Sequence, residues 1–203
     1  MSKTIAVIDG DEICFKIAAA CETRSILVTN KGNSQASSFK HRTEFKKFLE
    51  GVNVPSDFFD VVDVQTPEDI ANCFHSVKVV IEKIKKACGA DEIEVYLSGK
   101  DNFRDSIPLP SKYKGSRADT LRPVLLEDVR KYMKTKYHAK IVDGCEVDDV
   151  VCERMYTGYT SEQKIIGVTC DKDACGSVGW LFNPDKMLEP IFIDGLGSLW
   201  LEV

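Results

Sequence analysis

The sequence has little histidine and no paired cysteine motif. Its three histidines are His41, His75 and His138, and none of its eight cysteines forms a CxxC pair with another. Zinc sites normally use closely spaced histidines and cysteines, so this pattern excludes the common structural zinc folds. Most of the cysteines have apolar neighbours, and we expect these to be reduced and buried. They are Cys14, Cys21, Cys73, Cys88, Cys152 and Cys170.

The sequence also lacks a long apolar run. No stretch approaches the roughly 18 consecutive apolar residues that a membrane-spanning helix needs. The opening MSKTIAVIDG does not have the layout of a signal peptide, because its apolar part is short and leads directly into acidic residues. We therefore expect a cytoplasmic protein with no membrane partner.

What is present is an ordinary globular composition with an uneven distribution of charge. The chain has 203 residues, 43% of them hydrophobic and 29% charged, which suits a single domain over residues 1–203. The formal net charge is −5, but residues 100–140 carry 11 Lys/Arg against 5 Asp/Glu, and residues 141–203 carry 4 against 12. The basic block is compatible with a polyanionic partner, although the whole chain is acidic.

The apolar pattern predicts strands that alternate with helices. Short β-branched runs predict strands over residues 4–8, 92–98, 139–144 and 163–171. Helical spacing and capping residues predict helices over residues 12–22, 67–89 and 146–158. This order is typical of a three-layer α/β/α fold, in which helices cover both faces of a mainly parallel sheet. We expect residues 23–66 to be an insertion or a decorated hairpin, and residues 190–195 to be a strand and turn.

Acidic residues follow the predicted strands, at the edge where parallel sheets bind ligands. They are Asp9, Glu146, Asp148, Asp149, Asp171 and Asp173. Helix capping explains one or two of them, and we interpret Asp11 as an N-cap and Asp143 as part of a turn. Two carboxylates about 4 Å apart repel by about 4 kcal/mol at an effective dielectric of about 20, so the full set requires protons or cations, and a divalent cation is the simpler explanation. Oxygen ligands without histidine or cysteine favour Mg²⁺ or Mn²⁺, and two such ions suit phosphoryl transfer.

The basic block contains the segment NFRDSIPLPSKYKGSRADTLRP, residues 102–123. Lysines and arginines alternate there with prolines and with Phe103 and Tyr113. Such a segment suits a phosphate-binding arch, and a solvated surface loop is the alternative for this stretch taken alone.

The order of these motifs resembles a known family. A strand followed by DGD, then FR and YKGSR, then EVDD and CDKD, is similar to the 5′→3′ exonuclease and flap endonuclease family of the PIN-like superfamily, particularly its bacteriophage members. The resemblance covers residues 4 to about 195, except residues 23–66, which no motif matches. It implies a divalent-metal-dependent DNA nuclease with a helical arch over residues 100–136.

The resemblance also implies roles for individual residues. The six acids at the sheet edge match the metal-carrying acids of the family, directly or through water. Lys114 and Arg117 of YKGSR, with Arg104 and Lys112, match the arch residues that face the scissile phosphate. Family substrates are 5′ ends, flaps and nicked duplexes of DNA, with some RNA cleavage, which would place a phage-encoded member in the host cytoplasm.

The chain departs from the family pattern in two places. Where the family has an acid at the end of the second strand, this chain reads YLSGKDN, so only Asp101 could serve. The family's later glycine-Asp-x-x-Asp motif and its helix-hairpin DNA-binding part are absent, and Asp194 does not reproduce that spacing. A shortened piece of a longer protein, a split gene with a complementing C-terminal polypeptide, and natural loss each account for this. We expect the second metal position to be incomplete and the chain alone to be weakly active.

Two alternatives remain open at the level of the sequence. The first is a non-catalytic nucleic-acid-binding or assembly module of the same fold, in which the acids hold one structural ion. The second is a PIN-type ribonuclease, which shares the acidic sheet edge, although the long YKGSR segment favours the DNA nuclease.

Overall fold

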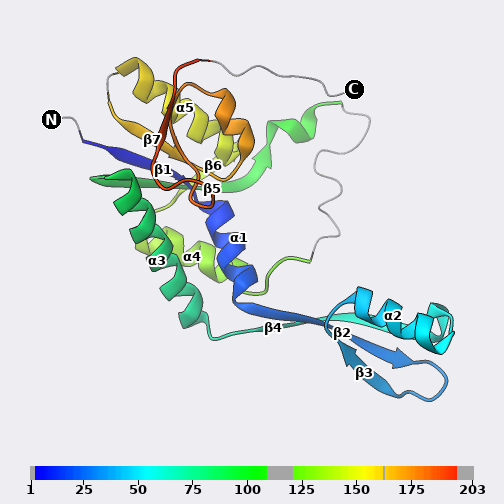
Figure 1. Cartoon of the computed structure of the whole chain (residues 1–203). Coiled ribbons are helices and arrows are strands. Elements are labelled where there is room, and N and C mark those ends of the chain that lie inside the picture. Colours follow the sequence, from blue (N-terminus) through cyan, green and yellow to red (C-terminus); the bar gives the residue numbers. More distant parts are fainter. Residues whose placement is uncertain (1–2, 109–120, 162, 196–203) are drawn as a thin grey trace.

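The computed structural model describes residues 3–108, 121–161 and 163–195, and in them the chain forms an α/β fold. The main sheet has six strands in the order β6-β5-β1-β7-β8-β9, and all neighbours except β8 and β9 are parallel (Figure 1). The strands are β1 (Ile5–Asp9), β5 (Glu92–Asn102), β6 (Lys140–Gly144), β7 (Ile165–Val168), β8 (Gly179–Phe182) and β9 (Ile191–Ile193). The predicted α/β fold with a mainly parallel sheet is confirmed.

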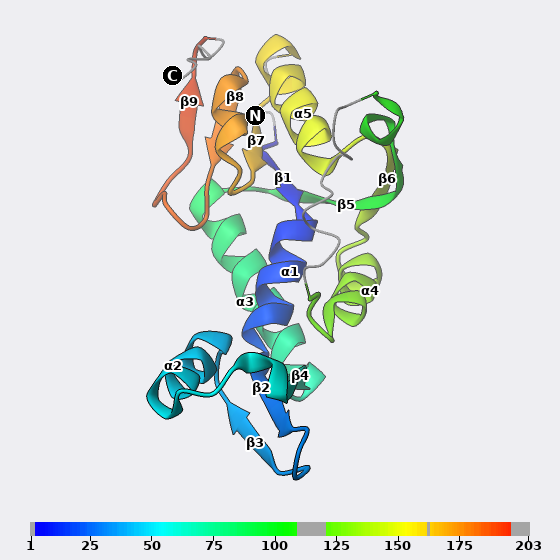
Figure 2. The same cartoon turned by 90° about the vertical axis from the view of Figure 1, so that its right-hand side faces the viewer.

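Helices cover both faces of this sheet (Figure 2). They are α1 (Gly10–Ala20), α3 (Ile70–Cys88) and α4 (Leu126–Lys136) on one face, and α5 (Val147–Ser161) on the other. The central strand β1 shows why both faces are needed. Ala6 and Ile8 pack with the three-helix layer, whereas Ile5 and Val7 pack with α5. A strand buried on both faces reads as a continuous apolar run, which is what this stretch of sequence shows.

Helix α1 follows β1 without a loop. Its N-cap is Asp9, the last residue of the strand, and its first residue is Gly10. A Cβ atom at Gly10 would lie 2.7 Å from the carbonyl oxygen of Tyr96 and 2.8 Å from Cγ1 of Val95, both in the neighbouring β5. Only glycine lets the chain turn this closely against β5, and this turn fixes Asp9 at the carboxyl edge of the sheet.

Residues 22–67, which we call the antiparallel lobe, lie between α1 and α3. The lobe contains β2 (Glu22–Asn30), β3 (Ala36–Phe39) and β4 (Phe59–Pro67) in the order β3-β2-β4, together with α2 (Arg42–Val52) and the short 3-10 helix η1 (Ser56–Phe58). Ile26, Val28 and Phe45 form a small core between the helix and the strands. Both views show the lobe beyond the last residues of α1, away from the main sheet (Figures 1 and 2).

Several element boundaries differ from the predicted ones. Helix α3 begins at Ile70 with Asp69 as its N-cap, so Pro67 precedes the helix instead of starting it. Strand β5 continues to Asn102, beyond the predicted end at residue 98, because the polar stretch after Leu97 still pairs with β6. Strand β8 was not predicted, since four apolar residues carry too little periodicity.

Part of the predicted arch belongs to the core. Residues 126–136 form α4, whose Leu126, Val129 and Met133 are buried against the main sheet layer. Of the remainder, the structure describes the 3-10 helix η2 (Phe103–Ser106), its flanks and residues 121–125. The lysines and arginines of α4 obscured its apolar stripe in the sequence.

All eight cysteines are free thiols. Cys14, Cys21, Cys73 and Cys88 are buried, as predicted. The prediction is wrong for Cys152 and Cys170, which are only partly buried. Cys170 lies just beyond the end of β7, where the chain leaves the core, and its sulfur is 2.9 Å from the Lys16 ammonium.

A buried carboxylate joins the antiparallel lobe to the basic segment. The Glu22 side chain has 0% exposure and accepts hydrogen bonds from Arg24 Nε (2.6 Å), Gln65 Nε2 (3.0 Å) and the Val124 N–H (2.9 Å). Gln65 also donates to the carbonyl oxygen of Arg122 at 2.8 Å. The described end of the basic segment is therefore fastened to the base of the lobe.

We predict that Gly10→Ala destabilises the protein. The added methyl group must displace the β5 backbone, and overpacking of this kind costs about 1–3 kcal/mol. Gly51→Ala is the matched control, because Gly51 lies in α2 and nothing lies within 4 Å of the position that a Cβ atom would take there. Alanine should stabilise that helix by about 0.5–1 kcal/mol. Equal effects of the two substitutions on urea unfolding would contradict the close packing at Gly10.

We predict that Glu22→Gln lowers the free energy of unfolding at pH 7 and that this loss shrinks in acid. Burial acts to raise the pKa of Glu22, but the donors Val124 N–H, Gln65 and Arg24 outweigh it, so the pKa lies below the usual 4.5. A carboxyl with a lowered pKa contributes stability that is present above its unfolded pKa and is lost as the pH falls.

Urea unfolding at several pH values measures this dependence. Glu68→Gln is the control, because Glu68 is an exposed acid in the same connection between lobe and core. A pH-independent difference between wild type and Glu22→Gln would refute the role assigned to the charge.

Candidate active site

The candidate site lies at the carboxyl edge of the main sheet, around Asp9. The Asp9 side chain is 8% exposed, and its Oδ1 accepts hydrogen bonds from the N–H groups of Asp11 (2.9 Å) and Glu12 (3.4 Å). These bonds are those of a helix N-cap. The N-cap of α1 is therefore Asp9, and the prediction that Asp11 has this role was wrong. The helix begins directly at the strand end, earlier than the sequence pattern indicated.

The surroundings of Asp9 disfavour its charge. The pKa of this carboxyl is raised from 3.8 to about 7, first by burial and then by the negative charge of Glu12, with further contributions from Asp148 and Asp171. The N–H of Glu12 acts in the opposite direction but does not compensate. Carboxylates from α1, from the start of α5 and from the segment after β7 thus act on one buried acid.

The start of α5 brings three of the predicted acids to this edge. Glu146 and Asp149 both lie against the Arg104 guanidinium of η2. Asp149 forms a bidentate pair with it, at 2.6 and 2.8 Å, while Glu146 Oε2 lies 3.9 Å away. Asp149 also accepts a hydrogen bond from the Glu146 N–H at 3.1 Å. Burial and the charge of Glu146 raise the pKa of the third acid, Asp148.

Arg104 was predicted as a phosphate-facing residue, and the structure places it beside the acids. Its guanidinium carbon lies 4.7 Å from the centre of the Phe103 ring, so it stacks on an aromatic side chain while pairing with Asp149. The other three predicted basic residues, Lys112, Lys114 and Arg117, lie outside the described residues.

The segment after β7 contributes Asp171 and Asp173. Asp171 is the N-cap of the 3-10 helix η4 (Lys172–Gly176), and its Oδ1 accepts the N–H of Asp173 at 3.0 Å. Both acids are exposed, and only Asp171 acts on the pKa of Asp9. A contact that the sequence did not reveal joins this segment to α1, because Glu12 Oε2 accepts the Cys170 N–H at 2.6 Å.

Asp11, Asp101 and Asp143 occupy the β5 side of the same edge. Asp11 accepts the Ser98 N–H at 2.7 Å and pairs with Arg130 of α4, which also donates to the Ser98 carbonyl oxygen. Asp143 accepts the Lys100 N–H at 3.2 Å and so joins β6 to β5, a strand-end role close to the turn that was predicted. Asp101 is exposed near the end of the long β5. Because β1 lies between β5 and β7 in the sheet, Asp101 is on the other side of β1 from the acids that follow β7.

The donor chemistry of this edge suits a hard divalent cation, because its ligand atoms are carboxylate oxygens. Within residues 3–108, 121–161 and 163–195, however, no three acidic, histidine or cysteine side chains converge on one point that could hold an ion. Arg104 and Arg130 pair with two of the acids and supply positive charge there. Asp9 and Asp148 are the acids of this edge whose pKa values are raised, and the charge of Asp171 contributes to the shift at Asp9.

Comparisons with known proteins add no relative. No protein-family model, no curated protein and no solved structure matches this chain. Among the described helices, none combines the length and the apolar character needed to cross a membrane.

We predict that Asp9→Asn stabilises the protein at pH 8 in the absence of divalent metal. Asparagine caps a helix as well as aspartate does, but it removes a charge that burial and neighbouring acids disfavour. Since the folded pKa is about 7 and the usual value is 3.8, wild-type stability should fall as the pH rises between these values. Thermal unfolding should show Asp9→Asn several degrees above wild type at pH 8 and level with it near pH 4.

Asp69→Asn is the matched control, because Asp69 caps α3 but is exposed. It should show no comparable gain at pH 8. An Asp9→Asn protein that is less stable than wild type at pH 8 would contradict the electrostatic description of the site.

Proposed function

We propose that this chain is a divalent-metal-dependent phosphodiesterase that cleaves DNA in the manner of 5′→3′ exonucleases and flap endonucleases. One observation carries the proposal. Asp9 is buried at the end of the central strand, and its pKa is raised to about 7 by burial and by acids from three other segments. Strongly perturbed acids at the ligand-binding edge of a parallel sheet are typical of functional sites.

The chain's own residues would hold the cation and the substrate. Asp9, Asp148 and Asp171 offer carboxylate oxygens, and a bound cation relieves the repulsion that raises the pKa of Asp9 and Asp148. A bound Mg²⁺ or Mn²⁺ ion would supply activation of water and neutralisation of a phosphate oxygen. Helix α1 fixes Asp9, and the Glu12 contact with the Cys170 N–H fixes the segment that carries Asp171.

Arg104 would bind the phosphate backbone. A guanidinium that forms a bidentate pair with a carboxylate has the geometry to form the same pair with a phosphate. Its partners Asp149 and Glu146 hold it at the sheet edge, next to the exposed Phe103, on which a nucleobase could stack. DNA is the proposed substrate because the motif order resembles DNA nucleases and residues 100–140 carry the positive charge.

A second candidate function is a nucleic-acid-binding module without catalysis. The observation that favours it is the neutralisation of Asp149 by Arg104 and of Asp11 by Arg130. In that case the arginines, and not metal ions, balance the acids. Binding that weakens steeply with salt, without cleavage in Mn²⁺, would identify this module.

We predict Mn²⁺- or Mg²⁺-dependent cleavage of a 5′-flap duplex labelled at its 3′ end. Asp9→Asn and Asp148→Asn should lower the cleavage rate on the order of 100-fold or more, because each removes a charge that stabilises the reaction. Asp128→Asn on α4 is the control, since the Asp128 side chain is 46% exposed and pairs with Lys131 of the same helix. It should leave the rate unchanged.

The same assay with a nicked duplex and with single-stranded RNA separates the related activities. Faster cleavage of RNA than of any DNA substrate would favour a PIN-type ribonuclease. Cleavage that survives both Asp9→Asn and Asp148→Asn, or that needs no divalent metal, would sink the proposal.

A further inference from the structure

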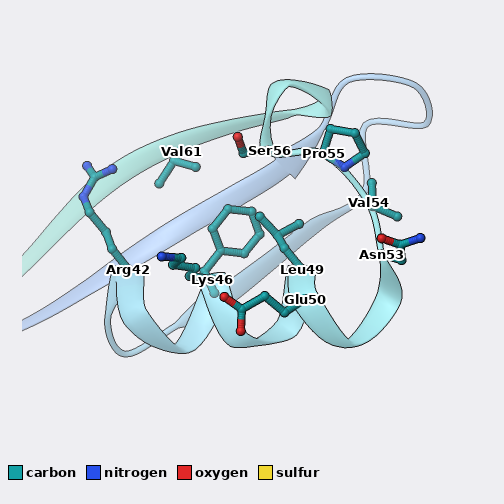
Figure 3. A pocket seen from close by; sticks show the side chains of 10 residues that line it. Arg42, Lys46, Leu49, Glu50, Asn53, Val54, Pro55, Ser56 and Val61 are labelled. Atoms are coloured by element: carbon teal, nitrogen blue, oxygen red, sulfur yellow. The ribbon is translucent and has the colours of Figure 1, made fainter.

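The antiparallel lobe contains an open groove of about 650 Å³ (Figure 3). None of its lining residues belongs to the candidate active site. One wall is α2, and the other is formed by β4 and the turn that precedes it. The floor is apolar. The lining residues are Arg42, Phe45, Lys46, Leu49, Glu50, Asn53, Val54, Pro55, Ser56 and Val61.

The groove lies beside β4, which is one of the two edge strands of the small sheet. Strand β4 pairs with β2 through its whole length, and no strand in the described part of the chain pairs with its other side. Val61 of β4 lines the groove, whereas β2 and β3 contribute no residue to the described lining. Backbone N–H and C=O groups on that outer side of β4 are therefore available next to an apolar channel.

An edge strand beside a helix-walled apolar groove is the arrangement that accepts an extended peptide. The peptide adds a strand to the sheet, and every second side chain enters the groove. The walls here suit such side chains, because Leu49, Val54 and Pro55 present apolar atoms to it and Val54 is 36% exposed. Edge strands are normally covered by another element or protected from pairing by charges, prolines or a short length. Strand β4, in contrast, is nine residues long.

The charges of the walls indicate which peptide fits. Arg42 and Lys46 lie at one end of the groove, and Glu50 lies one turn further along α2 (Figure 3). Arg42 is paired with Asp63 of β4 at 2.6 Å, while Lys46 forms no ion pair with any described residue. Lys46 therefore offers a positive charge to one acidic side chain. A nucleic acid, with a charge on every phosphate, would meet the carboxylates of Glu50 and Asp63 as well.

We propose that the groove between α2 and β4 binds an extended segment of a partner protein. The segment pairs with β4, places alternate apolar side chains over Leu49 and Val54, and directs an acidic residue to Lys46. This inference does not depend on the proposed nuclease activity, because none of these residues belongs to the sheet edge around Asp9. It makes the lobe a docking element that could bring the chain to another protein.

Binding of fluorescein-labelled peptides to the full chain tests the proposal. The probe is the pentapeptide Glu-Thr-Val-Thr-Phe, in which Glu, Val and Phe share one face of a strand, together with the reversed order, because an added strand can run in either direction. Fluorescence anisotropy should show binding of one of them with a Kd below about 1 mM. A peptide with proline in place of both threonines should not bind, since it lacks the N–H donors that a strand needs.

Lys46→Glu tests the charge assignment, and Lys47→Glu is the matched control on the exposed side of the same helix. Lys46→Glu should weaken binding of the acidic peptide about tenfold, and the variant should prefer a peptide with lysine in place of glutamate. Lys47→Glu should change neither property. Circular dichroism melts of both variants test whether the protein remains folded. Val54→Asp should also weaken binding, because it places a charge on the apolar wall.

Three outcomes would overturn the proposal. The first is that neither peptide order binds, or that the proline peptide binds equally well. The second is displacement of the peptide by oligothymidylate, together with equal losses of peptide affinity in Lys46→Glu and Lys47→Glu. This result would assign the surface to nucleic acid. The third is a dimer in sedimentation that Lys46→Glu dissociates and that excludes the peptide, which would assign the groove to a second copy.

Discussion

The site depends on one carboxylate that is buried where the central strand meets its helix. Asp9 caps α1, a contribution of about 1 kcal/mol that asparagine or serine would also provide. Keeping its charge with a pKa of about 7 instead of 3.8 costs on the order of 4 kcal/mol. The cap therefore does not explain why an acid occupies this position. A group whose electrostatic cost exceeds its structural contribution points to a ligand that removes the cost, and a divalent cation does so for oxygen donors.

The acids of the edge divide into two electrostatic classes. Asp149 pairs with Arg104 and Asp11 pairs with Arg130, so these two acids are balanced within the chain. Asp9 and Asp148 have raised pKa values, because burial and neighbouring acids dominate, and at Asp148 they outweigh the charge of Arg104. An added cation would be stabilised most beside Asp9 and Asp148. The metal ion proposed above would therefore lie between β1, the start of α5 and the segment after β7.

The sequence predicted those parts of the molecule in which local pattern and tertiary role agree. Strand β1 and the acids around the start of α5 were found because a doubly buried strand is continuously apolar and because helix capping and turns do not account for all four acids within residues 143–149. Helix α4 was missed because seven of its residues are polar and its apolar face is only three side chains wide. The pairing of Arg104 with Asp149 could not be predicted, since the two residues are 45 positions apart and nothing local links them. The same reason hid the Glu22 contact with Val124, across 102 positions.

The contacts that could not be predicted also show how the basic block is held to the rest of the chain. The basic block begins beside Asp149 and Glu146 and returns to the core past Glu22, so each of its described ends meets a carboxylate from a distant part of the sequence. At the return, Arg24 donates to the Leu121 carbonyl oxygen and Gln65 to that of Arg122, so β2 and β4 of the lobe both hold the segment. The lobe is consequently coupled to the basic segment through hydrogen bonds at its base, while its α2 groove lies at the opposite end of β4. A partner segment added to β4 would therefore extend the same strand whose other end holds the basic segment.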